Sequence, residues 1–156
     1  MSASILNVRG KTDGELRRLR ALGVNELNIG VESGLDEALA RMNKAYTAGE
    51  ARNELLRLRA AGFDCGLNVI LGAAGAERRL ENAAATAELL NAAQPFLIFT
   101  GTVHADPGCP LYEDMQCGAF TEPTFGEYLE EEEALLEQLK HLTPMALEQM
   151  EKMLKS

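Results

Sequence analysis

The feature that most constrains the fold of this chain is an alternation of short apolar runs with longer helical patterns between Ile5 and Val103. Short apolar runs rich in β-branched residues are typical of strands, and the helical patterns between them indicate connecting helices. A strand that follows a connecting helix runs parallel to the strand before it, so this order predicts an α/β fold with a parallel sheet. The strands are expected at residues 4–8, 26–31, 65–71 and 96–103, with both faces covered at the mostly apolar third strand.

Several helix boundaries are marked by capping residues. Thr12, Thr47 and Thr124 are each followed three positions later by glutamate, a spacing typical of a capping box at a helix start. Gly23 and Gly62 are expected to end the first two of these helices. Further helices are expected at residues 35–42 and 78–92. The predicted apolar stripes are Leu16, Leu19 and Leu22, then Leu80, Ala84, Ala87 and Leu90 or Asn91, and finally Phe125, Leu129, Leu136 and Leu139.

The stretches after the last strand have a different character. Residues 104–121 contain two prolines and two glycines and are expected to form an irregular loop. Thr143 and Pro144 indicate a helix start, with threonine as the cap and proline at the first helical position. We therefore divide the chain into a βα domain over residues 1–142 and a helical tail over residues 143–156.

Charge and composition narrow the classes of partner. The 24 acidic and 15 basic residues give a formal net charge of -9, which disfavours direct contact with nucleic acid or an anionic membrane. The glutamate run at residues 130–133 is expected to form a solvated helix face. A membrane span needs about 20 apolar residues, and neither such a stretch nor a signal peptide is present, so a cytoplasmic location is expected.

The cysteines and the loop histidine offer little metal chemistry. Cys65, Cys109 and Cys117 show no CxxC spacing and are expected to be reduced thiols too far apart to hold an iron-sulfur cluster. His104 and Asp106 have the spacing of an acid-base or metal pair. The chain has one other histidine, so a zinc site lacks ligands, and an ordinary loop histidine is the favoured interpretation.

Ligand-binding residues in βα folds gather at the carboxyl ends of the strands, and candidate residues follow each predicted strand here. Arg9 follows the first strand, Glu32 and Ser33 the second, a glycine turn at residues 72–75 the third, and His104 with Asp106 the fourth. Each also has a structural interpretation. Arg9 would be a surface cation, Ser33 a helix cap, Glu32 a partner for the helix dipole, and the glycine turn a site of close packing.

Several segments resemble radical S-adenosylmethionine (SAM) enzymes, in the branch of the oxygen-independent coproporphyrinogen dehydrogenases and Elongator-type tRNA modifiers. The segments are residues 28–36 (NIGVESGLD), 42–47 (MNKAYT), 69–75 (VILGAAG) and 107–113 (PGCPLYE), in the order found in that family. The resemblance extends from Ile5 to about Leu142. It implies a four-stranded parallel βα half, strands three to six, of a (β/α)6 partial TIM barrel, with helices at its C-terminal end.

The resemblance also implies roles for individual residues in binding SAM. Glu32 and Ser33 would hydrogen-bond the ammonium or ribose hydroxyls, and Arg9 would pair with the carboxylate. The strand and turn containing Ile70, Gly72 and Gly75 would lie against adenine. The sequence departs from the family pattern in the turn, because glycine stands at position 75 where the family has glutamate.

The CxxxCxxC motif that supplies the three cluster thiolates in this family is absent. The resemblance therefore implies the C-terminal, SAM-binding portion of a radical SAM enzyme, inactive alone and without ligands for the 4Fe-4S cluster. Such a portion would join a missing N-terminal half, or a partner chain, at the strand edge from Ile5 to Val8. The alternative is a cluster-less binding or assembly module that pairs through that edge, either with a partner or with a second copy.

Overall fold

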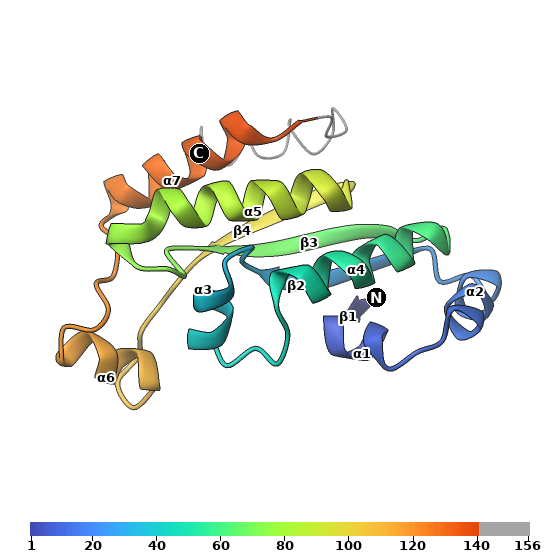
Figure 1. The fold of residues 1–156 in the computed structure, drawn as a ribbon, viewed down its shortest axis with the longest axis horizontal. Helices are drawn as coiled ribbons and strands as arrows, with labels where there is room; N and C mark the ends of the chain where they lie inside the picture. Colours follow the sequence, from blue (N-terminus) through green and yellow to red (C-terminus); the bar gives the residue numbers. More distant parts are fainter. Residues whose placement is uncertain (141–156) are drawn as a thin grey trace.

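The computed structural model describes residues 1–140 and contains one parallel sheet with strand order β1-β2-β3-β4 (Figure 1). The predicted α/β class and four-stranded parallel βα half are confirmed. The described elements are β1 (Ser2–Ala3), α1 (Ile5–Arg9), α2 (Asp13–Ala21), β2 (Glu26–Glu32), α3 (Asp36–Arg41), α4 (Ala48–Ala60), β3 (Asp64–Leu71), the 3-10 turn η1 (Ala76–Arg78), α5 (Arg79–Ala93), β4 (Leu97–Thr102), α6 (Pro110–Gln116) and α7 (Phe125–Gln138).

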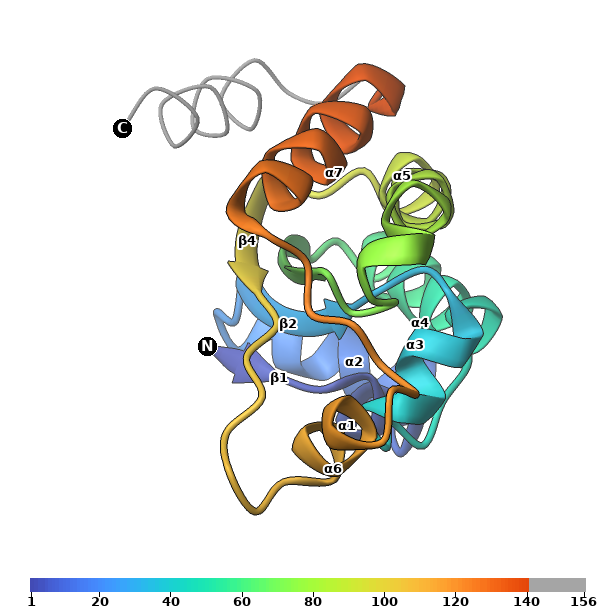
Figure 2. The same ribbon diagram turned by 90° about the vertical axis from the view of Figure 1, so that its left-hand side faces the viewer.

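Within residues 1–140, helices cover one face of the sheet and leave the other face open. Figure 2 shows α4 and α5 on the same side of the strands, and α7 lies beside α5. Alternate strand residues point into this helical layer and form the core, because successive side chains of a strand face opposite sides. The core includes Ile29, Val31, Leu67, Val69 and Ile98 from the strands and Leu55, Leu58 and Leu90 from the helices.

The prediction of a first strand at residues 4–8 is wrong. Ile5–Arg9 is helix α1, and the first strand is the two-residue β1, which pairs with β2. The Ser4 hydroxyl accepts a hydrogen bond from the Asn7 amide, and the Asn7 side chain accepts one from the Ser4 amide. This unrecognised capping box starts a helix, and Ile5 and Val8 are buried in the core instead of forming a sheet edge.

The three threonine caps are confirmed. Each threonine hydroxyl accepts from the amide three residues later, and each glutamate accepts from the threonine amide. The loop prediction for residues 104–121 is wrong in its centre, where α6 occupies Pro110–Gln116. The sulfur of Cys109 accepts a hydrogen bond from the Tyr112 amide and so caps this helix. Pro110 stands at the first helical position, where the N–H that proline lacks would have no partner within the helix.

The predicted apolar stripe of α5 is displaced. Leu80 and Ala84 are exposed, whereas Ala87 and Leu90 are buried as expected. The helix packs against the sheet on one side and against α7 on another, so its buried surface is broader than a single stripe. The buried residues of α5 are Asn82, Ala83, Thr86, Ala87, Leu89, Leu90 and Ala93.

The prediction for α7 is wrong in two respects. Phe125 and Leu129 lie on the exposed side, with 78% and 40% of their surfaces accessible. Within the glutamate run, Glu131 and Glu132 are buried, and only their neighbours are exposed. The glutamate run is therefore not simply a solvated face, because two of its carboxylates point toward α5 and β4.

The helical tail predicted for residues 143–156 lies outside the described residues, and that division of the chain stays a prediction. Within residues 1–140, none of the helices has the length and apolar character needed to cross a membrane.

Candidate functional site

The candidate site is a groove on the open face of the sheet, with a volume of about 500 Å³. The expectation that both faces would be covered at the third strand is wrong for the described residues, since Asn68 of β3 is exposed. All four strands contribute to the groove, β1 through Ser2, and the groove reaches the carboxyl ends of β2 and β4 at Glu32 and Gly101. The lining includes Asn28 and Glu32 from β2, Asn68 and Ile70 from β3, and Phe99 and Gly101 from β4.

Two asparagine amides lie in the groove, each opposite a glycine on the neighbouring strand. Asn28 pairs with Gly66, and Asn68 pairs with Gly30. A Cβ atom added to Gly66 would lie 2.5 Å from Asn28 Oδ1, so the glycine makes space for this amide. Both asparagines are exposed, and neither side chain takes part in the hydrogen bonds within residues 1–140. Each therefore offers both donors and an acceptor to a ligand.

Phe99 places an aromatic ring beside these amides. It pairs with Asn68 across the β3–β4 ladder, and 41% of its surface is exposed. An exposed aromatic face can stack against a planar ring such as a nucleobase, and amide groups at its side can hydrogen-bond the edge of that ring. The groove thus has the composition of a site for a small ligand with a planar heterocycle.

Glu32 lies at the carboxyl end of β2, where the pairing with β3 shifts by one residue. Its φ of 65° is in the left-handed region, a conformation that costs a non-glycine residue of the order of 1–3 kcal/mol. The side chain folds back over Gly30, where an added Cβ would collide with Glu32 Oε1. Lys44 Nζ lies 3.1 Å from the same carboxylate oxygen. The carboxylate therefore faces the groove with its charge partly neutralised.

Tyr46 supports this strand end from beneath. Its hydroxyl donates to the carbonyl oxygen of Gly30 at 3.1 Å, and the ring is buried. Burial, with a smaller contribution from the nearby Glu32 carboxylate, raises the pKa of Tyr46 to about 12. The tyrosine stays protonated at neutral pH and positions the strand rather than transferring a proton.

Ser33 faces away from the groove. It is fully buried, its hydroxyl accepts from the amide of Leu35 at 2.9 Å, and it donates to Asn82 Oδ1 at 2.5 Å. Asn82 in turn donates to Glu131 Oε1 at 2.6 Å. The serine hydroxyl is committed to the helical layer in this structure, and its bond with the Leu35 amide is a local turn contact. The interpretation of Ser33 as a helix cap is wrong, because the cap residue of α3 is Leu35, which makes no side-chain cap hydrogen bond.

The same buried chain of hydrogen bonds reaches the glycine turn after β3. Glu131 Oε2 accepts from the amide of Gly72 at 2.7 Å. Burial raises the pKa of Glu131, and the hydrogen bonds from Asn82 and Gly72 oppose that rise because they favour the ionised form. We name this set, Ser33, Asn82, Glu131 and Gly72, the buried polar chain.

Gly72 and Gly75 are required by packing. Both have positive φ, and an added Cβ at Gly72 would lie 2.5 Å from Tyr128 Cε1. At Gly75 it would lie 3.3 Å from the Phe120 ring, and the Gly75 amide donates to the carbonyl of Gly72. The amides of both glycines are already used within the chain, and Ile70 is the one of these three predicted binding residues that lines the groove.

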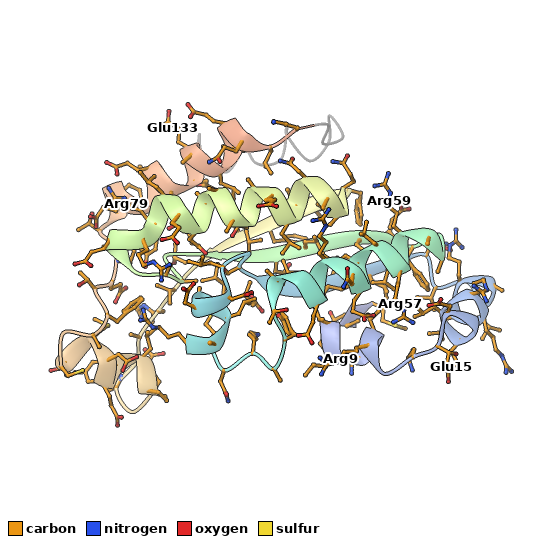
Figure 3. The ribbon with its side chains drawn as sticks, in the orientation of Figure 1. Arg9, Glu15, Arg57, Arg59, Arg79 and Glu133 are labelled. Carbon is orange, nitrogen blue, oxygen red and sulfur yellow. The ribbon has the colours of Figure 1, made fainter. Side chains whose placement is uncertain are left out.

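Arg9 lies on α1, and its guanidinium is 3.4 Å from Glu50 of α4 (Figure 3). Of the six predicted binding residues, the structure brings Glu32 and Ile70 together in the groove. Arg9, Ser33, Gly72 and Gly75 are not among its lining residues. The groove residues that sequence reasoning missed are Ser2, Asn28, Asn68, Val69, Phe99, Thr100 and Gly101. Polar residues at alternate positions of the predicted strands were the signal for the two asparagines.

Metal ligands do not converge in the described part of the chain. Residues 1–140 contain no group of three His, Cys, Asp or Glu side chains placed to hold a metal ion. Cys65 lies near the start of β3. Burial, with a smaller effect of Asp64, raises the pKa of its thiol to about 11. Cys109 and Cys117 flank α6. His104 and Asp106 are both highly exposed, with Nε2 and Oδ1 3.5 Å apart.

Comparison with solved structures shows a likeness in fold. No family model matches the chain, and no curated protein matches it. A solved structure of coproporphyrinogen III oxidase (HemN) from Escherichia coli, described as a radical SAM enzyme, is similar with a TM-score of 0.55 and 16% sequence identity. The match covers 98% of this chain and 30% of that chain. The chain is thus related in fold to part of a radical SAM enzyme and spans less than a third of its length.

Proposed function

We propose that the groove binds SAM and that this chain is the C-terminal, SAM-binding portion of a radical SAM enzyme of the coproporphyrinogen dehydrogenase branch. The observation that carries the proposal is the pair of free amides, Asn28 and Asn68, beside the exposed ring of Phe99. They lie on the open face of a half-barrel sheet whose fold is related to that of a radical SAM enzyme. We infer the branch from the HemN likeness and the segments at residues 28–36 and 69–75.

The groove residues fit the chemistry of SAM. Phe99 would stack against adenine, and the two amides offer the mixed donors and acceptors that its edge requires. Glu32 would accept hydrogen bonds from the ribose hydroxyls or the ammonium group. Because Lys44 already contacts this carboxylate, an incoming ammonium group must compete with it. Bound SAM would contribute a sulfonium centre, which is open to reductive cleavage.

The residues described do not fit the cluster. Three converging thiolates are needed, whereas the cysteines of this chain are divided between the start of β3 and the two ends of α6. Radical chemistry would therefore require cluster ligands from another segment or another polypeptide. We expect the chain alone to bind ligand without turnover.

Calorimetric titration of the full chain with SAM tests the proposal. We expect binding at micromolar concentrations, weakened about tenfold by Asn68→Ala and by Glu32→Gln, since each removes about one hydrogen bond of 1–1.5 kcal/mol. Glu26→Gln is the matched control, because Glu26 is an exposed carboxylate at the opposite end of the same strand. Adenosine and methionine titrated separately would show which part of SAM contributes most of the affinity.

Two outcomes would contradict the proposal. One is the absence of binding at millimolar SAM in a chain that remains folded by circular dichroism. The other is binding that Asn68→Ala, Glu32→Gln and Glu26→Gln all leave unchanged, which would place SAM outside the groove.

A further inference from the structure

The sheet has two open edges of the same kind. β1 is paired on one side with β2, and β4 is paired on one side with β3, so within residues 1–140 each has an unpaired side. All the strands are parallel. The β4 edge of one copy can therefore continue into the β1 edge of another without reversing the strand direction, and unpaired edges are ready templates for such pairing.

An apolar hollow of about 240 Å³ lies at the β1 edge. Its lining includes leucines of α2, β2 and α4 together with Phe63, and Ala3 of β1 also lines it. Leu22 at the end of α2 is 73% exposed, although the sequence pattern assigns it to the buried stripe, and Leu6 of α1 is 41% exposed. This side of the molecule thus carries more uncovered apolar surface than single exposed leucines usually provide.

The β4 edge carries a matching apolar ridge. Phe125 and Leu129 lie one turn apart on the exposed side of α7, and Glu132 follows on the same stripe. The carboxylate of Glu132 accepts from the hydroxyl of Thr100 on β4 at 3.0 Å, which places the stripe beside the edge strand. In a βα arrangement this is the side on which a helix would cover the next strand.

The two edges also differ in charge. Residues 1–25 contain five basic and two acidic residues, whereas residues 125–140 contain six glutamates and one lysine. Figure 3 shows Arg9 and Glu133 on opposite sides of the molecule. Opposite charges on the two edges favour contact between unlike edges and oppose contact between like edges.

We propose that two copies of this chain associate edge to edge, with β4 and α7 of each copy docked on β1 and α2 of the other. The Phe125–Leu129 ridge of one copy would fill the apolar hollow of its partner. Both contacts are the same, so the pair has two-fold symmetry and closes into a ring of eight parallel strands, a number at which parallel barrels close. The two grooves would then face each other. This association does not depend on SAM.

Sedimentation of the full chain across a range of protein concentrations tests this. We expect a dimer of twice the 16.9 kDa chain mass. The double variant Phe125→Ser with Leu129→Ser should be monomeric or should dimerise at least about a hundredfold more weakly, because it removes two apolar side chains from the docked surface. The matched control replaces Leu56 and Leu80, which are 40% and 53% exposed but lie on α4 and α5 away from both edges, and should remain dimeric.

A charge exchange tests the pairing of unlike edges. Variant one carries Arg17→Glu and Arg18→Glu on α2, and variant two carries Glu133→Lys and Glu137→Lys on α7; these positions are exposed. We expect each variant alone to be monomeric and an equal mixture to form the heterodimer, because each meets its opposite charge only in the mixed pair.

Three outcomes would overturn the proposal. A dimer unaffected by the α7 substitutions would show that β1 edges pair with each other, and a mass that grows continuously with concentration would show an open chain of subunits. A monomer at all concentrations would show that another occupant covers the edges. If Phe125→Ser also destabilised that monomer, a segment of the same chain would be the occupant that covers the ridge.

Discussion

The two faces of this sheet treat the same side chain in opposite ways. Asn82, in the helical layer, is 2% exposed, and its amide both accepts from Ser33 and donates to Glu131. Asn68, on the open face, is exposed and makes no side-chain hydrogen bond within residues 1–140. A polar residue in a βα unit is therefore structural where the packed layers supply its hydrogen-bond partners. Where they do not, it remains available to a ligand.

The strongest test of this contrast is Glu131→Leu. It leaves the amide of Gly72 and the amide group of Asn82 without acceptors in the core, and we expect the free energy of unfolding to fall by about 3 kcal/mol. The control Glu133→Leu, at an exposed position of the same helix, should change it by less than about 0.5 kcal/mol. Urea denaturation measures both, and equal losses would contradict the structural role of the buried polar chain.

The next largest difference in stability is expected between substitutions of two glycines, Gly72 and Gly101. Gly72→Ala should destabilise by about 2 kcal/mol or more, since it combines a left-handed φ of 77° with a collision against Tyr128. Gly101→Ala, on the open side of β4, meets no atom within 4 Å and should change stability by less than about 0.5 kcal/mol. Thermal unfolding monitored by circular dichroism separates them. Equal losses for the two variants would show that the packing against Tyr128 does not decide the cost at Gly72.

Substitution of the asparagine in the packed layer should again lower the free energy of unfolding more than substitution of the one on the open face, with a smaller difference than for the glycines. Asn82→Ala is expected to lower the free energy of unfolding by about 1.5 kcal/mol, because the buried hydroxyl of Ser33 and the Glu131 carboxylate each lose a hydrogen-bond partner. Asn68→Ala is expected to have an effect within about 0.5 kcal/mol while weakening ligand binding. The reverse order in urea denaturation would mean that the open face is the structural one.

The smallest expected effect is a pH dependence from Glu131. Because burial raises the pKa of Glu131 in the folded state, the folded protein holds this proton more tightly than the unfolded chain does. The stability that Glu131 contributes is therefore present at and below its ordinary pKa of about 4.5 and is lost as the pH rises through the folded-state pKa. The lowered pKa values of Glu15, Glu81 and Glu127 act in the opposite direction.

The difference in unfolding free energy between wild type and Glu131→Gln isolates this contribution. We expect the wild type to lose stability relative to the variant as the pH is raised above about 4.5. A difference that is constant with pH would show that Glu131 titrates alike in the folded and unfolded chains.

Local signals predicted most of the elements. The caps at Thr12, Thr47 and Thr124 were predictable because a capping box involves residues only three positions apart. The error at the first strand is also local. The Ser4 and Asn7 pair is a capping box with asparagine in place of glutamate, and without it the apolar run from Ile5 reads as a strand. Cys109 is a similar case, since a thiol is an uncommon helix cap.

The candidate site was predicted less completely. Glu32 and Ile70 were expected from their position near the carboxyl ends of the strands, and both line the groove. Ser33 was expected beside Glu32, yet the left-handed φ of Glu32 and the pairing shift at Gly30 accompany a turn that directs Ser33 into the helical layer. Neighbours in sequence can therefore end on opposite sides of the sheet.

The alternation of strands and helices, the parallel direction of the strands and the lack of a cluster motif follow from periodicity, local capping and residue identity. The burial of Glu131, the packing of Gly72 beneath Tyr128 and the unpaired side chain of Asn68 within residues 1–140 depend on the tertiary structure. The physical reason is the sequence separation of the partners: Ser33 and Asn82 are 49 positions apart, and Gly72 and Glu131 are 59 apart. No local pattern encodes such a pairing.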